Sequence, residues 1–137
     1  MNSILNSLDT EESFNILNKT SEQIFQEKYN AINELDLEEE ILNKLLNQLD
    51  NYIYIDELND VIYGSYLKWI PLSDVESIKL TKGGVVTDVT IGQHSPIIKC
   101  KNFSNKCFAF DFNKSIVFRK LSNQENVLLS VANYLNK

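Results

Sequence analysis

Between residues 52 and 121 the chain is a succession of short runs rich in β-branched and aromatic residues, separated by glycine, proline, asparagine and serine. Runs of this length and composition, bounded by turn-forming residues, are typical of β-strands. Their regular spacing predicts an antiparallel β-meander or small barrel of about five strands. The runs are Tyr52–Ile55, Ile62–Ile70, Val75–Thr81, Val85–Ile91, Pro96–Phe103, Cys107–Phe112 and Ile116–Leu121.

Three turns within this region are marked by their residues. Gly83-Gly84 stands between Val75–Thr81 and Val85–Ile91, and a Gly-Gly pair between two alternating runs indicates a hairpin. The polar residues Ser104-Asn105-Lys106 predict a second hairpin. Asn113-Lys114 predicts a tight turn before the last run.

Helical patterns lie on both sides of the β-region. Thr20 and Gln23 have the spacing of a capping box, and so do Ser122 and Glu125 near the carboxyl end. We expect the carboxy-terminal helix to bury one face, because its apolar residues recur at helical spacing. That face comprises Leu128, Val131, Ala132 and Leu135.

A further helix is predicted after Asp36, which we expect to act as its N-cap, with Glu39 at the third helical position. Apolar residues between Leu37 and Leu49 follow one helical stripe. Together these patterns predict an α+β fold with amino-terminal amphipathic helices, the antiparallel sheet and a carboxy-terminal helix. A soft boundary near residue 58 divides an acidic helical region, 1–57, from a β-meander with its terminal helix, 58–137, in what we expect to be one compact unit.

Charge is distributed unevenly along the chain. Residues 1–60 contain three lysines and fourteen acidic residues, whereas residues 61–137 contain ten basic and five acidic residues. Halves of opposite sign attract each other or face different partners.

One side of the predicted sheet carries lysine. Period-2 alternation places apolar residues on the core side and lysines on the other, with aromatic residues nearby. Lysines that bind phosphates beside rings that stack on bases are typical of small nucleic-acid-binding barrels. Lysine on the solvent side of an ordinary strand gives the same pattern, so both interpretations stay open. The residues are Lys68, Lys79, Lys99 and Lys101, with Tyr66 and Phe103.

A second interpretation, which we favour at this point, is a non-enzymatic protein-binding or assembly module. A helix with a wide apolar stripe rarely packs against one neighbour only, which leaves apolar side chains for a protein partner or for self-association. The side chains expected to bind such a partner are Ile4, Leu5, Leu8, Leu37, Ile41 and Leu45.

The sequence lacks the motifs of common catalytic and cofactor sites. It has no G-x-S-x-G, Walker-type P-loop, H-E-x-x-H or G-x-G-x-x-G pattern. The single histidine, His94, lies in a glycine- and proline-bounded turn, and with Cys100 and Cys107 it leaves a zinc ion short of a fourth ligand. We therefore expect no enzymatic activity, no cofactor and no metal.

The two cysteines are too few for a disulfide framework, which indicates a reducing compartment. Residues 1–10 have no positive charge and no long apolar run, so we expect no signal peptide. The apolar runs are far shorter than the ~20 residues that span a bilayer, so we expect no membrane association.

Four segments carry a resemblance to a known group of proteins. They are Tyr63–Ile70, Leu80–Val86, Ile98–Asn102 and Phe118–Glu125. Residues 60–137 resemble uncharacterised small proteins of giant viruses, the nucleocytoplasmic large DNA viruses. The many asparagine, lysine and isoleucine residues suggest an AT-rich genome, which fits such a source. The resemblance implies a viral protein located in the host cytoplasm, a virus factory or the particle, and it implies no catalytic residue. On the protein-binding interpretation, we expect a virion or transcription-machinery component of a large DNA virus.

Overall fold

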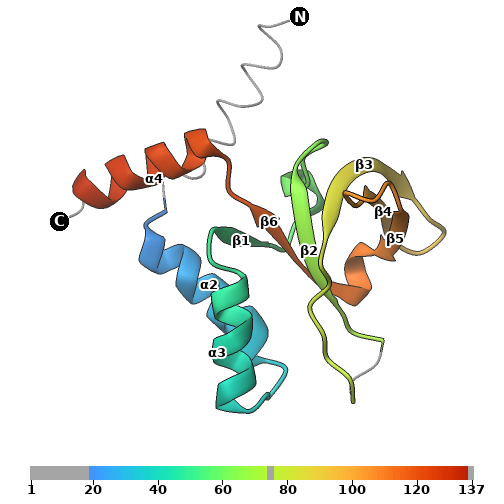
Figure 1. The fold of residues 1–137 in the computed structure, drawn as a ribbon, viewed down its shortest axis with the longest axis horizontal. Coiled ribbons are helices and arrows are strands. Elements are labelled where there is room, and N and C mark those ends of the chain that lie inside the picture. Colours follow the sequence, from blue (N-terminus) through green and yellow to red (C-terminus); the bar gives the residue numbers. More distant parts are fainter. Residues whose placement is uncertain (1–18, 74–75, 136–137) are drawn as a thin grey trace, which may run out of the picture.

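The computed structural model describes residues 19–73 and 76–135, which form an antiparallel sheet accompanied by helices (Figure 1). The helices are α2 (Ser21–Asn33), α3 (Glu39–Gln48) and α4 (Asn123–Leu135), with two 3-10 turns, η1 (Leu58–Asp60) and η2 (Phe112–Lys114). The strands are β1 (Tyr52–Ile55), β2 (Tyr66–Pro71), β3 (Gly84–Ile91), β4 (Pro96–Lys101), β5 (Cys107–Asp111) and β6 (Ser115–Lys120). The predicted α+β class is confirmed, with six strands in place of about five.

The sheet is strongly curled but not closed. Its strand order is β1-β6-β2-β3-β4-β5, so β5 and β6 are consecutive in the chain but four positions apart in the sheet. In a flat sheet four spacings would separate them by roughly 19 Å. The three residues of η2 join them, and the four Cα–Cα steps from Asp111 to Ser115 span at most about 15 Å. The sheet must therefore fold over itself, which Figure 1 shows for β3, β4 and β5 beside β2 and β6.

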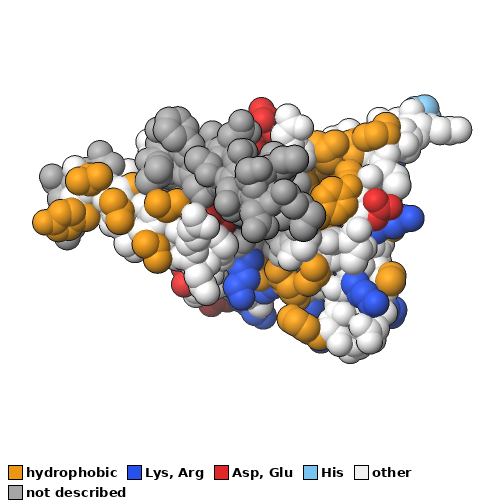
Figure 2. All heavy atoms as spheres, turned by 90° about the horizontal axis from the view of Figure 1, so that it is seen from above, with side chains coloured by type: hydrophobic (Ala, Val, Ile, Leu, Met, Phe, Trp, Pro, Cys, Tyr) orange, Lys and Arg blue, Asp and Glu red, His pale blue; other side chains and the backbone are white. Residues whose placement is uncertain are grey.

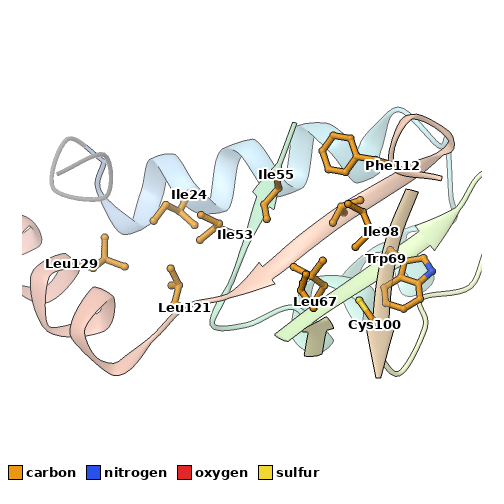
Figure 3. Close-up of a cluster of buried hydrophobic side chains, with 12 residues drawn as sticks. Ile24, Ile53, Ile55, Leu67, Trp69, Ile98, Cys100, Phe112, Leu121 and Leu129 are labelled. Atoms are coloured by element: carbon orange, nitrogen blue, oxygen red, sulfur yellow. The ribbon is translucent and has the colours of Figure 1, made fainter. Parts of the chain in front are cut away.

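The inside of this curl is the main hydrophobic core. Trp69 on β2 stacks on Phe110 on β5, with ring centroids 4.1 Å apart and planes 15° apart, although two strands lie between them in the sheet order. Cys100 and Ile98 are fully buried beside this pair. Figure 3 shows the core continuing from here to Ile24 at the far end.

Helix α3 covers the opposite face of the sheet, whereas α2 packs beside β1, with Ile24 in the main core and Ile32 on the side of α3. A second buried cluster lies there, in which Leu42, Leu45 and Leu49 of α3 pack with Ile70 and Phe118 of the sheet. These leucines are the inner part of the predicted apolar stripe, and their burial confirms the amphipathic helix.

Lys28 joins the two amino-terminal helices. The Nζ atom of Lys28 donates to the carbonyl of Leu49 at 2.9 Å, at the end of α3. Burial lowers the pKa of the Lys28 ammonium, and the nearby charge of Asp50 opposes that shift.

Both predicted capping boxes are present. The amide of Gln23 donates to Thr20 Oγ1 at 3.2 Å, and the amide of Thr20 donates to Gln23 Oε1 at 2.8 Å. At α4 the amide of Glu125 donates to Ser122 Oγ at 3.1 Å, and the amide of Ser122 donates to Glu125 Oε1 at 3.0 Å. Each box satisfies backbone donors that a helix start leaves without an intrahelical partner.

The predicted N-cap of α3 is wrong. The cap is Glu38, whose side chain makes no capping bond, whereas Asp36 has a φ of 53°. Asp36 lies in the tight turn that ends α2, where its amide donates to the carbonyl of Asn33. Aspartate tolerates this left-handed backbone better than most residues, so the turn takes it.

The predicted strand Val75–Thr81 and its Gly83-Gly84 hairpin are also wrong. Residues 76–81 form no strand, and Thr81 instead runs beside β2: its amide donates to the carbonyl of Trp69, and its hydroxyl accepts from the Trp69 amide. Because the Thr81 hydroxyl, and not a backbone carbonyl, accepts from the Trp69 amide, regular backbone pairing with β2 ends at this point. The long run Ile62–Ile70 is likewise shorter, because Gly64, with a φ of 82°, turns the chain before β2.

The buried face of α4 differs from the predicted one. Glu125, Leu129 and Ala132 are buried, whereas Val131 and Leu135 of the predicted face are exposed. The ion pair of Glu125 with Arg119 on β6 orients the helix in this way.

Candidate nucleic-acid interface

An exposed aromatic pair lies on the outer face of the sheet. The rings of Tyr66 on β2 and Phe103 after β4 are stacked, with centroids 5.8 Å apart and planes 21° apart. Phe103 is 88% exposed, although an apolar ring of this size is normally buried in the core. The hydroxyl of Tyr66 donates to the carbonyl of Lys82 at 2.7 Å, which holds the Tyr66 ring of the stack in place.

The turn that presents Phe103 is held by its own hydrogen bonds. Asn102 Oδ1 accepts from the amides of Ser104 and Lys106, both at 2.9 Å, and the amide of Asn102 donates to the carbonyl of Lys106. Asn105 adopts a φ of 64°, a conformation that asparagine tolerates. This confirms the predicted second hairpin and places Phe103 on a rigid support.

Lysines surround the pair on the same face. Pairing aligns Tyr66 with Val85 and Val85 with Lys101, so these residues form one row across β2, β3 and β4. Lys68 and Lys99 lie two residues along their strands from Tyr66 and Lys101, and therefore point to the same side. The predicted alternation is confirmed here, since the intervening residues are buried.

Gly83 brings a further lysine, Lys82, to this face. A Cβ atom at Gly83 would lie 2.8 Å from a ring carbon of Tyr66, 2.9 Å from Cγ of Lys68 and 2.2 Å from the carbonyl of Leu67. With its φ of 88° as well, only glycine fits this position. The backbone of Lys82 and Gly83 therefore packs directly against Tyr66 and Lys68. Lys82 is not among the predicted residues, because its place depends on the path of the loop and not on strand alternation.

The charge of this face is little compensated. Among the residues that the structure describes, ion pairs join Lys19 to Glu27 and Arg119 to Glu125, and neither pair involves this face. Asp88 is the register partner of Lys99 and offsets part of its charge. Lys68 lies with its Nζ 5.2 Å from the ring centre of Tyr52. Figure 2 shows lysines interspersed with hydrophobic side chains at the end of the molecule away from α4.

Lys79 is the predicted residue that the structure does not place on the sheet. It is exposed within the irregular segment 76–83, two residues before Thr81. The structure therefore brings together five of the six predicted residues, Tyr66, Phe103, Lys68, Lys99 and Lys101, and adds Lys82.

The predicted partner-binding residues differ from one another in where they lie. Ile4, Leu5 and Leu8 lie outside the described residues. Leu45 is buried in the second cluster, Leu37 is half-buried against it, and Ile41 alone of these three is exposed.

A larger apolar surface lies on α4. Val127, Val131, Tyr134 and Leu135 are exposed at helical spacing, and the two last are each 74% exposed. Figure 2 shows hydrophobic side chains along the projecting helix. The sequence feature that indicates this apolar surface is the run of apolar residues in a helix whose single charged residue, Glu125, is buried.

The cysteines lie on opposite faces of the sheet. Cys100 is paired with Phe108 and points into the core, whereas Cys107 is paired with Lys101 and is exposed. Burial raises the pKa of the Cys100 thiol to about 12, so it stays protonated and unreactive.

Two hollows flank the buried Arg119. One, of about 360 Å³, lies between α2 and β1 and is lined mainly by polar residues, among them Glu27, Glu34 and Asp56. The other, of about 560 Å³, lies between the turn at Tyr63 and the start of α4. Within residues 19–73 and 76–135, no group of three His, Cys, Asp or Glu side chains is placed to hold a metal ion.

No protein-family model, curated protein or solved structure matches this chain. The described part of the chain contains no helix with the length and apolar character needed to cross a membrane.

Proposed function

We propose that this protein binds single-stranded nucleic acid on the face formed by Tyr66, Phe103 and the surrounding lysines. The observation that supports this most is the exposed ring of Phe103, stacked on a tyrosine that is itself hydrogen-bonded in place. An unpaired base has an open π-face and stacks on such a ring whatever its identity. Duplex nucleic acid keeps its bases stacked on each other, so it gains less from this surface.

The lysines supply the second part of the interaction. Lys68, Lys82 and Lys101 lie around the aromatic pair and would neutralise the phosphates on either side of a stacked base. Lysine contacts phosphate as a point charge and reads no base edge. The proposed binding is therefore tolerant of sequence and sensitive to salt.

The test compares two phenylalanines that differ in position. Fluorescence anisotropy of a labelled single-stranded oligonucleotide measures affinity for the full chain at low salt. Phe103→Ala should weaken binding about fivefold or more, since one base–ring stack contributes roughly 1–3 kcal/mol. Phe108→Ala is the matched control, because Phe108 is a partly exposed phenylalanine on the opposite face of the sheet. Equal affinities for the two variants would contradict the proposal.

A second candidate is a protein-binding module that assembles a particle or the transcription machinery of a large DNA virus. The exposed apolar face of α4 favours it, because soluble domains rarely expose four large apolar side chains together except at an interaction surface. In this account Val131→Glu would abolish binding of a partner protein and leave affinity for nucleic acid unchanged. If the full chain has no affinity for single-stranded nucleic acid at low salt, only this second candidate stands.

A further inference from the structure

Strand β5 forms an edge of the sheet that nothing in its sequence protects. Among the described strands only β4 pairs with it. It is also the strand without a buried residue, and Cys107, Phe108 and Ala109 are all exposed. Edge strands usually carry lysine, proline or a bulge that prevents pairing with another chain, and Cys107–Asp111 has none of these. The other edge, β1, is flanked by α2.

The backbone groups that face outward from β5 follow from the adjoining turn. The amide of Asn102 donates to the carbonyl of Lys106, which makes these two residues a hydrogen-bonded pair. Hydrogen-bonded pairs alternate along an antiparallel ladder, so Phe108 and Phe110 bond to β4. The amides and carbonyls of Cys107, Ala109 and Asp111 therefore point away from the sheet.

We propose that β5 pairs in antiparallel fashion with β5 of a second copy of this chain, about a twofold axis at Ala109. In this register Ala109 faces its own counterpart, and Cys107 faces Asp111 of the second copy, so all the outward backbone groups are paired. Phe108 then lies opposite Phe110 of the second copy and loses its exposure. This interaction is independent of the proposed binding of nucleic acid.

Aromatic self-complementarity favours a second copy as the occupant. Phe108, which is 37% exposed, faces Phe110 of the second copy in this register, so the twofold axis sets an aromatic cross-strand pair on each side of Ala109. A second copy also presents an equally long free edge. A contact of five residues on each side is small, which predicts a dissociation constant of roughly 10–100 µM.

The test measures the oligomeric state of the full chain by sedimentation over a range of concentrations, with reductant present to prevent a disulfide through Cys107. The wild type should pass from monomer to dimer as its concentration rises. Ala109→Pro removes the outward amide and leaves the bonds to β4 intact, so it should weaken dimerisation about tenfold or more. Ala109→Val is the matched control, because it keeps that amide and favours a strand, and it should dimerise like the wild type.

Ala109→Lys supplies a second edge-blocking variant, and circular dichroism shows whether each variant is folded. It should lose dimerisation as Ala109→Pro does. A wild type that stays monomeric up to about ten times the expected dissociation constant would overturn the proposal. So would a dimer that survives both blocking substitutions, or one that is lost on Val131→Glu in α4.

Discussion

The guanidinium of Arg119 on β6 binds both carboxylate oxygens of Glu125 on α4, with nitrogen–oxygen distances of 2.7 and 2.9 Å. Both side chains are buried, and Arg119 is the single arginine of the chain. Glu125 also accepts from the amide of Ser122, so one carboxylate caps the helix and joins it to the sheet. This pair fixes which face of α4 is buried and which is left exposed.

We expect Glu125→Gln to lower the free energy of unfolding by about 3–5 kcal/mol. Removing one partner of a buried ion pair leaves the other charge without compensation in the interior. Urea unfolding followed by circular dichroism measures the loss. Gln124→Ala, at an exposed position in the same turn, is the control and should change stability by about 0.5 kcal/mol or less. A loss below about 1 kcal/mol for Glu125→Gln would show that the pair does not hold the helix.

The same pair predicts a pH dependence of stability. Burial alone would raise the pKa of the Glu125 carboxyl, but hydrogen bonds and charge from Arg119, with help from Ser122, outweigh it and hold the pKa below the ordinary 4.5. The unfolded chain therefore binds the proton first as the pH falls. The stabilisation is fully present above pH 4.5 and is lost as the pH falls through the lower pKa of the folded state.

Unfolding free energies of the wild type and of Glu125→Gln, measured between neutral and acid pH, test this sign. The difference between the two proteins should be constant above pH 4.5 and shrink below it. A difference that grows on acidification would mean that the pKa is raised in the folded state.

The local features of this fold could be predicted from the sequence. Both capping boxes depend on residues three apart, and the hairpin at Asn105 depends on one turn. The position of β6 between β1 and β2 could not, because it follows from pairing between residues more than forty apart. The role of Asp36 was mispredicted because it lies in a backbone turn that no periodicity reveals. The conformation at Thr81 was mispredicted because it depends on Trp69, a neighbour distant in sequence.

The candidate site was predictable for a related reason. Alternation within β2 and β4 is enough to place Tyr66, Lys68, Lys99 and Lys101 on one face, and β4 leads directly to Phe103. The position of Lys82 could not be predicted in this way, because it depends on the path of the loop before β3. The exposed face of α4 required knowledge that Glu125 is buried, which a charged residue near a helix start does not suggest.

A comparison of Phe110 with Phe108 tests the curl of the sheet. Phe110→Ala removes the ring that stacks on Trp69 and should lower the free energy of unfolding by about 3 kcal/mol. Phe108→Ala, two residues away in the same strand, should cost less than about 1 kcal/mol, because this ring is 37% exposed. Equal losses in urea unfolding would show that β5 does not fold back over β2.

The most direct test of the proposed function is the salt dependence of affinity for a single-stranded oligonucleotide. We expect the wild-type dissociation constant to rise steeply with salt. Lys82→Gln with Lys101→Gln should flatten the slope of log affinity against log salt by about 1.4, since each lost phosphate contact removes about 0.7. Lys19→Gln, at a lysine that is already paired with Glu27 outside this face, should leave the slope unchanged. An unaltered slope in the double variant, or no wild-type affinity at low salt, would contradict the account.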